Sequence, residues 1–154
     1  KLNYLLQKTS ELGVNKLIPI ETKRCVVKID CSKEKTKIDR WKKICKEASE
    51  QSFRSDIPEI SSILTLQDLV DLNYDLKLLC SLNKNTKNIK KILEKNNKCV
   101  KILLVVGPEG GFDPLEEEYL LKNGFKSVSL GDNVLRAETA PVVALSMINY
   151  EFMR

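Results

Sequence analysis

Short apolar runs separated by longer stretches of mixed polarity recur along the chain. The apolar runs predict strands at 16–20, 76–80, 101–106 and 126–129. The run at 101–106 is almost wholly apolar, which is typical of a strand that a parallel sheet buries on both faces.

Helical spacing of apolar residues fills most of the intervals between these runs. Residues 39–53 are predicted as an amphipathic helix because Trp41, Ile44, Cys45 and Ala48 recur at helical spacing. The lysine-rich stretch before it, residues 26–37, is predicted as a loop. Further helices are predicted at 4–12, 66–70, 86–95, 114–123 and 140–153. Strands that alternate with helices indicate an α/β domain with a mainly parallel sheet flanked by helices.

Helix ends carry recognisable signals. Asp113 is predicted as an N-cap, with Pro114 at the first helical position and Glu116 reaching back to the cap. Gly13 and Gly124 follow predicted helices as C-terminal stops. Thr139 is predicted to cap the last helix.

The length of 154 residues suits one domain, and 42% hydrophobic residues are enough to fill a single core. Residues 1–154 are therefore predicted to form one domain. Because the chain has no run of about 18 apolar residues, no membrane-spanning helix is expected.

The chain has five cysteines and no histidine. Without histidine, Ser-His-Asp and Cys-His catalysis are excluded. No metal site is expected, because cysteines alone would have to supply the ligands and no Cys-x-x-Cys pair is present. Reduced thiols are the simplest interpretation, and they predict a cytoplasmic protein.

Positive charge is concentrated in the first third of the chain. Residues 1–54 contain 14 Lys/Arg and 7 Asp/Glu (net +7), whereas residues 55–154 contain 12 and 14 (net −2), which together give +5. This asymmetry indicates a polyanionic partner, with a nucleic acid ahead of an acidic protein. A solvated lysine-rich surface would give the same pattern, so charge alone leaves both interpretations open.

Three loops after predicted strands are candidates for a ligand site, since ligands of α/β sheets bind beyond the carboxyl ends of strands. The first follows Leu79-Cys80-Ser81-Leu82. Residues 107–112 contain three of the six glycines, and residues 130–140 contain Arg136 and Glu138. The glycine pattern matches neither the dinucleotide fingerprint nor the Walker phosphate loop. From the residues alone, an ordinary turn and a ligand loop both remain open, and Arg136 and Glu138 could either act on a ligand or brace their loop.

The same segments resemble a known family. Gly107-Pro108-Glu109-Gly110-Gly111, then Leu130-Gly131, then Leu135-Arg136-Ala137-Glu138-Thr139-Ala140 resemble the RsmE family of ribosomal RNA uridine-N3 methyltransferases. Upstream, Glu11-Leu12-Gly13-Val14, Arg40-Trp41 and Glu50-Gln51-Ser52-x-Arg54 are similar to segments of that family in the same order. One departure is Ala137, where the family more often has threonine.

The resemblance implies a SPOUT-type α/β knot, with a deep trefoil knot in the C-terminal half. It implies a homodimer that uses S-adenosylmethionine to methylate N3 of a uridine in 16S ribosomal RNA of the small ribosomal subunit. The last helix is then a candidate dimer contact, although burial in the monomer core would account for its apolar residues equally well. The family also has an N-terminal PUA-like β-barrel that binds RNA, and this domain is expected to be absent from the present chain.

The resemblance also implies the roles of particular residues. Arg136 is expected to stabilise negative charge on the uracil, and Glu138 either acts as the base or orders the loop. The predicted cofactor contacts are Leu82, Gly107, Glu109, Gly110, Gly111, Leu130, Gly131, Val134, Leu135, Arg136, Ala137, Thr139 and Ala140. The predicted RNA contacts are Arg24, Arg40, Gln51 and Arg54.

Two other classes of protein share parts of this pattern. A non-catalytic RNA-binding module with the same knotted fold would use the basic segment but would not bind S-adenosylmethionine. A nucleotide-binding oxidoreductase would need an early glycine-rich turn with an acidic residue about 20 positions later, which the chain lacks.

Overall fold

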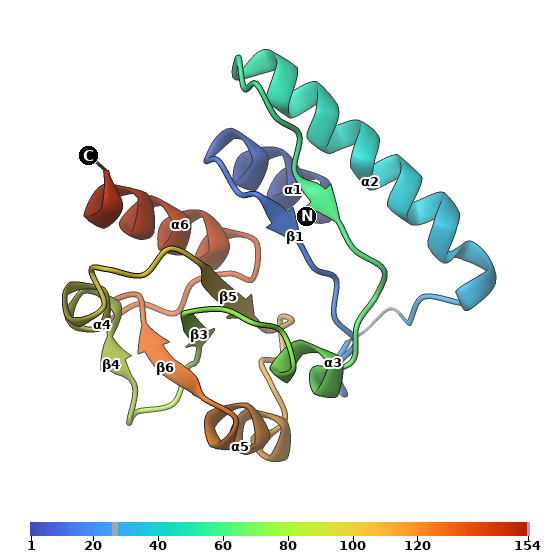
Figure 1. Cartoon of the computed structure of the whole chain (residues 1–154). Helices are drawn as coiled ribbons and strands as arrows, with labels where there is room; N and C mark the ends of the chain where they lie inside the picture. The colour runs from blue at the N-terminus through green and yellow to red at the C-terminus, as the bar shows by residue number, and fades with distance from the viewer. Residues whose placement is uncertain (26–27, 154) are drawn as a thin grey trace.

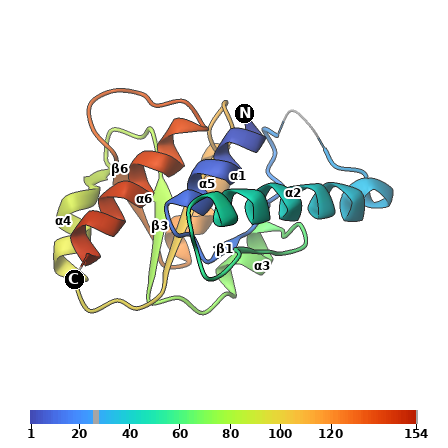
Figure 2. The same cartoon turned by 90° about the horizontal axis from the view of Figure 1, so that it is seen from above.

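The computed structural model describes residues 1–25 and 28–153 (Figures 1 and 2). The helices are α1 (Leu2–Glu11), α2 (Cys31–Gln51), α3 (Leu66–Val70), α4 (Ile89–Lys95), α5 (Pro114–Lys122) and α6 (Thr139–Phe152). The strands are β1 (Lys16–Leu17), β2 (Glu59–Ile60), β3 (Leu76–Cys80), β4 (Lys87–Asn88), β5 (Ile102–Val106) and β6 (Phe125–Ser129).

A four-stranded parallel sheet in the order β4-β6-β3-β5 forms the centre of the C-terminal half. Cys80 at the end of β3 lies opposite Val106 on one side and Val128 on the other. The carboxyl ends of β3, β5 and β6 therefore meet at one edge of the sheet. This arrangement confirms the predicted α/β class with a parallel sheet flanked by helices, whereas the trefoil knot stays a prediction.

Helices cover both faces of this sheet. Alternate side chains of each strand point to opposite faces, so the apolar strands place apolar side chains on both faces for the helices to bury. On one face, Leu79 of β3 belongs to a buried cluster with Leu120 of α5 and Leu69 of α3. On the other face, Leu78 packs with Ile92 of α4 and Ala144 of α6. Figure 1 shows α5 below and α3 to the right of the sheet, with α4 and α6 toward its upper left. This packing explains the apolar run at 101–106, which forms β5 between the two clusters.

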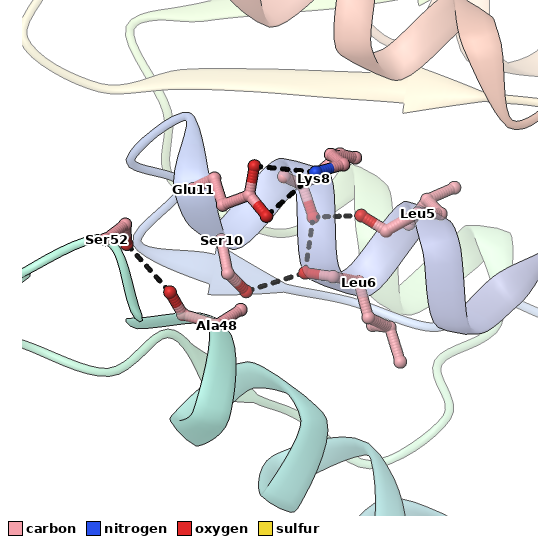
Figure 3. A network of polar contacts seen from close by, with 8 residues as sticks. Leu5, Leu6, Lys8, Ser10, Glu11, Ala48 and Ser52 are labelled. Atoms are coloured by element: carbon pink, nitrogen blue, oxygen red, sulfur yellow. Dashed lines mark hydrogen bonds and ion pairs between the residues drawn. The ribbon is translucent and has the colours of Figure 1, made fainter. Parts of the chain in front are cut away.

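A third cluster joins α1, α2 and β2, with Leu6, Trp41, Cys45 and Ile60 buried together. The contact between α1 and α2 is close and includes buried hydroxyl groups. Figure 3 shows two hydroxyls that are satisfied locally: buried Ser10 Oγ donates to the Leu6 carbonyl at 2.7 Å, and half-buried Ser52 Oγ donates to the Ala48 carbonyl at 2.8 Å. Such back-bonding satisfies these two donors within their own helices, whereas the buried Ser49 Oγ has no partner among the described residues.

The predicted loop over 26–37 is wrong for residues 31–37, which form the first turns of α2. Residues 26 and 27 lie outside the described part of the chain. Asp30 caps the helix by accepting a hydrogen bond from the Ser32 N–H at 3.1 Å. Glu34 then ties this end to a distant segment, because its carboxylate accepts from the Ile63 N–H at 2.9 Å. This contact is tertiary, so the local lysine-rich pattern gives no sign of it.

Other boundaries differ in smaller ways. The strand predicted at 16–20 is shorter, with β1 followed by an isolated bridge between Ile20 and Leu64. The two-residue strands β2 and β4 were not predicted, because two residues show no periodicity. Thr139 does not cap α6: it is the first helical residue, and Glu138 takes the N-cap position without a side-chain cap.

The helix-end signals around α5 are confirmed. Asp113 and Glu116 form a reciprocal capping box with Pro114 at the start of the helix. Gly13 and Gly124 end α1 and α5 with φ of +86° and +90°, values that side chains with a Cβ rarely adopt. Among the described residues, no helix has the length and apolar character that crossing a membrane requires.

Arg54 connects the C-terminal ends of α1 and α2, which meet at the α1–α2 corner. Its guanidinium donates to the carbonyls of Ser10 (2.7 Å) and Val14 (3.0 Å) and to the Asp56 carboxylate (2.7 Å). Only 11% of its side chain is exposed. The structure thus gives Arg54 a bracing role within this chain, and its predicted contact with RNA stays a prediction.

We expect Arg54→Ala to lower the free energy of unfolding by about 2–3 kcal/mol, because two carbonyls and a carboxylate lose a charged donor. Urea denaturation measures this change. Lys46→Ala is the matched control: the Lys46–Glu50 pair is exposed and 3.8 Å long, so its loss should change stability by less than about 0.5 kcal/mol. Equal effects of the two substitutions would contradict the bracing role.

Candidate functional site

A cavity of about 580 Å³ opens at the edge where β3, β5 and β6 end. Its walls come from the segments that follow these three strands. Every predicted cofactor contact lines it except Thr139. Thr139 lies next to this wall, where its N–H donates to the Arg136 carbonyl at 2.9 Å. Segments more than 50 residues apart in sequence are brought together here by the parallel register of the sheet.

The glycine loop after β5 is closely packed. A Cβ added to Gly107 would lie 3.1 Å from two ring atoms of Phe112, which is itself buried. Gly111 has φ of +69°, and its N–H donates to the Pro108 carbonyl at 2.8 Å. A Cβ at Gly110 would meet only the Arg24 side chain, at an ordinary 3.6 Å. Close packing therefore favours glycine at 107 and backbone conformation favours it at 111, whereas neither constrains position 110.

The segment 22–25 is hydrogen-bonded to this loop and to the start of α5. Arg24 donates to the Gly110 carbonyl at 2.7 Å. One oxygen of Glu116 accepts from the Lys23 N–H at 2.8 Å, and the other accepts from the Asp113 N–H at 3.1 Å. Arg24, predicted from the sequence as an RNA contact, thus forms part of the cavity wall. Glu116 is only 9% exposed, so its carboxylate acts as a fixed link between the N-terminal segment and α5.

Charged groups gather on part of the cavity wall. Lys1 forms an ion pair and hydrogen bond with Glu109, which raises the pKa of Lys1 and lowers the pKa of Glu109. Arg136 is exposed, and within the described residues its guanidinium has no hydrogen-bond or ion-pair partner. Glu138 is half-buried, and its Oε2 atom is buried without a partner in that same part of the chain. An uncommitted guanidinium and an unpaired carboxylate oxygen in one cavity wall are groups that a ligand can engage.

Sequence reasoning missed several residues of this cavity. Glu117 enters it from the first turn of α5 and accepts a hydrogen bond from Ser81 Oγ. The remaining lining residues that were not predicted as ligand contacts are Lys1, Cys80, Ser81, Asn83, Val106, Pro108, Phe112, Val128, Ser129 and Asn133. Except for Lys1, they lie within the candidate loops or within two positions of them, so taking each whole loop with its flanking residues would have included them. Glu117 had no such signal beyond its place on the helix that follows the glycine loop.

Three of the four predicted RNA contacts lie elsewhere. Arg40 and Gln51 are exposed on α2, and Arg54 is committed to the α1–α2 corner. These three residues do not line the cavity. Figure 2 shows α2 extending away from the sheet, with α1 between it and α6. A role for Arg40 and Gln51 in RNA binding stays a prediction.

Cys80 lines the cavity but is not expected to act as a nucleophile. Burial raises the pKa of its thiol to about 12, so almost none of it is thiolate at neutral pH. We expect iodoacetamide at about pH 8 to alkylate exposed Cys31 first and to leave Cys80 unmodified. Peptide mass spectrometry measures both sites. The same reaction in denaturant should label all five cysteines, and labelling of native Cys80 as fast as Cys31 would contradict the expectation.

Comparisons with known proteins match this chain over nearly its whole length. It is 38% identical to the ribosomal RNA small subunit methyltransferase E of Bacillus subtilis, covering 98% of this chain and 61% of that protein. It is 36% identical to the Mesomycoplasma hyopneumoniae protein of the same name, covering 93% of this chain and 61% of the relative. The chain therefore spans less than two thirds of the length of these relatives.

Two solved structures share the fold. A putative methyltransferase from Legionella pneumophila, in complex with bound S-adenosylmethionine (SAM), superposes with a TM-score of 0.90 and 35% identity, covering 97% of this chain and 60% of that one. The Neisseria gonorrhoeae ribosomal RNA small subunit methyltransferase E, bound to S-adenosylmethionine, gives 0.87 and 32%, with the same coverage. The family described as RNA methyltransferase domain matches residues 1–149. The segments that carry the resemblance form the cavity. The chain belongs to this RNA methyltransferase domain family.

Proposed function

We propose that this chain binds S-adenosylmethionine in the cavity at the carboxyl edge of its sheet and transfers the methyl group to N3 of a uridine in 16S ribosomal RNA. The observation that carries the proposal is the convergence of nearly all predicted cofactor residues on one cavity. The names of the relatives support the substrate class. Such a reaction would take place in the cytoplasm, where the five free cysteines would stay reduced.

The cavity suits the cofactor in size and chemistry. About 580 Å³ lies within the usual range for sites of small molecules, roughly 300–1,000 Å³. Gly111 leaves open space where a side chain would stand, because an added Cβ would meet no atom within 4 Å, so a ligand can approach bare backbone there. Leu82, Leu130 and Leu135 add apolar surface suited to an adenine ring. The unpaired Glu138 oxygen is a buried acceptor that needs a donor from a ligand.

When bound, S-adenosylmethionine supplies a methyl group on a positively charged sulfur. The chain has to hold the uracil in line with that group and stabilise the anion left when N3 loses its proton. Arg136 is suited to this second task, because its free guanidinium can donate to two carbonyl oxygens at once and stays protonated. Glu138 either accepts the N3 proton or orders the loop that carries Arg136, and its buried, unpaired oxygen suits the first role.

RNA would approach over the basic first third of the chain. Arg24 stands at the cavity beside Gly110, and Arg40 and Gln51 are exposed on α2. We propose that these three residues contact the RNA, with phosphates as the main partners of the two arginines. Arg54 would act indirectly by holding the α1–α2 corner.

We propose further that two copies of the chain form a homodimer. A second hollow, of about 760 Å³, lies between α1, β5 and α6 and is lined by apolar residues that include Leu145, Ile148 and Phe152. Within the four-stranded sheet, β5 is an edge strand. A partner that covered this hollow would bury apolar surface that water now reaches. Size-exclusion chromatography with light scattering tests this, and the mass of a single chain would overturn it.

Calorimetric titration of the full-length protein with S-adenosylmethionine tests the function first. We expect binding at micromolar concentrations, followed by methyl transfer to 16S ribosomal RNA from cells that lack the modification. A protein that binds this RNA but gives no heat with the cofactor would be a non-catalytic RNA-binding module, and the proposal would be wrong. Mapping the methylated base by mass spectrometry then decides between N3 and other positions.

A further inference from the structure

A carboxylate enters the cavity from α5, separate from the loops that carry the family resemblance. Glu117 is half-buried, and one of its oxygens, Oε1, accepts a hydrogen bond from Ser81 Oγ. The Ser81 hydroxyl in turn accepts from the Asn83 N–H at 3.0 Å. The serine is therefore fixed on both sides, and it fixes the position of the carboxylate.

The Glu117 carboxylate makes few contacts that stabilise the fold. The N-terminus of α5 is already satisfied by Asp113 and Glu116, which form its capping box. Within the described residues, no cation lies within ion-pair distance of Glu117, and its second oxygen, Oε2, has no hydrogen-bond partner. A carboxylate with one oxygen anchored and the other free is arranged to accept hydrogen bonds from something in the cavity.

The position of Glu117 follows from the register of the sheet. Ser81, Gly107 and Ser129 each follow one of the paired residues Cys80, Val106 and Val128, so they lie side by side along the carboxyl edge. Ser81 directly follows β3, the middle strand of these three, and it holds Glu117 over the centre of that edge. The cavity lining along this edge includes Leu82 and Gly107 as well as the uncharged polar residues Asn83 and Ser129.

On this basis, and resting on the proposed function, we infer that Glu117, positioned by Ser81, accepts hydrogen bonds from the ribose hydroxyls of S-adenosylmethionine. A ribose presents two neighbouring O–H donors, and a carboxylate can accept both. The adenosine portion fits among the uncharged and backbone groups on the side of Glu117, since the other charged lining groups are Arg24, beside Gly110, and the group of Lys1, Glu109, Arg136 and Glu138. Glu117 would thereby select a ribose over a deoxyribose.

The test measures affinities of the full-length protein by calorimetry with three ligands: S-adenosylhomocysteine, 5′-methylthioadenosine and 2′-deoxy-5′-methylthioadenosine. The second ligand lacks the amino-acid portion, and the third also lacks one ribose hydroxyl. We expect Glu117→Gln to weaken the first two ligands by the same factor, about 10- to 100-fold. We expect the variant to bind the deoxy ligand nearly as well as the ribose ligand, whereas the unaltered protein should prefer ribose.

Two further variants separate positioning from folding. Ser81→Ala should weaken both ribose ligands about 3- to 10-fold without changing the melting temperature. Glu118→Gln, one position along α5, removes an exposed carboxylate paired with Lys122 and should leave all affinities unchanged.

The outcomes distinguish the inference from the proposed function. If the unaltered protein binds S-adenosylhomocysteine and Glu117→Gln binds it equally well, the inference is wrong while the proposed function stands. If Glu117→Gln weakens S-adenosylhomocysteine but not 5′-methylthioadenosine, the carboxylate contacts the amino-acid portion, and the assignment to ribose is overturned. If the unaltered protein binds neither ligand, the proposed function fails and the inference fails with it.

Discussion

Arg136→Ala is expected to lower kcat for methyl transfer to ribosomal RNA by on the order of 100- to 1,000-fold in the full-length protein. The side chain lines the cavity, is exposed, and has no partner among the described residues. Its removal therefore breaks no contact that supports the fold, but it takes away the cation that would stabilise the uracil anion. Single-turnover assays with radiolabelled cofactor measure the rate, and the melting temperature should stay within about 1 °C of the starting value.

Two further substitutions sharpen this result. Arg136→Lys keeps the charge but loses the planar pair of donors, so we expect only partial recovery. Lys122→Ala removes an exposed cation at the far end of α5 and should leave the rate unchanged. A rate for Arg136→Ala within a few-fold of the unaltered protein would show that another group stabilises the anion.

Gly107→Ala is expected to weaken cofactor binding by roughly tenfold or more and to lower stability by about 1–3 kcal/mol. The added methyl group would lie 3.1 Å from the buried Phe112 ring and 3.3 Å from the Gly111 backbone, so the loop has to shift. A shifted loop no longer presents its backbone groups to the adenosine. Calorimetry measures the affinity, and urea denaturation measures the stability.

The same loop supplies the control for stability. Gly110→Ala introduces a methyl group that meets only Arg24 at 3.6 Å, so its free energy of unfolding should change by less than about 0.5 kcal/mol. Adding Phe112→Leu to Gly107→Ala removes the overlapping ring atoms and should restore part of the affinity. Normal cofactor binding by Gly107→Ala alone would show that the close packing at this glycine does not shape the site.

The difference between Gly107 and Gly110 illustrates where sequence reasoning reaches its limit. Both glycines belong to one motif, and both were predicted as cofactor contacts on the same grounds. Only the position of the Phe112 ring, which packs into the core beneath the loop, makes an added Cβ crowded at Gly107 and not at Gly110. A sequence motif shows that glycine is present at a position, whereas the neighbouring atoms in the structure show what a side chain there would contact.

Glu117 and Arg54 show the same limit for polar residues. Glu117 is one of three consecutive glutamates on α5, and the sequence does not distinguish it from Glu116 or Glu118. In the structure Glu116 caps the helix, Glu118 pairs with Lys122, and Glu117 faces the cavity. Arg54 resembles an RNA contact by motif, but its donors are used by carbonyls 40 and 44 residues away in sequence.

The sequence by itself determined the α/β class, the strands at 76–80 and 101–106 and the capped start of α5, because periodicity and capping are local properties of neighbouring residues. It also supplied the loop segments that line the cavity, through the order of their motifs. Tertiary structure alone decided the contact of Glu34 with the Ile63 backbone, the hydrogen bonds of Arg24 and Glu116 that join the N-terminal segment to the glycine loop and α5, and the place of Glu117 beside Ser81. Each of these rests on a hydrogen bond between residues 29 to 93 positions apart, and local pattern carries no information about such partners.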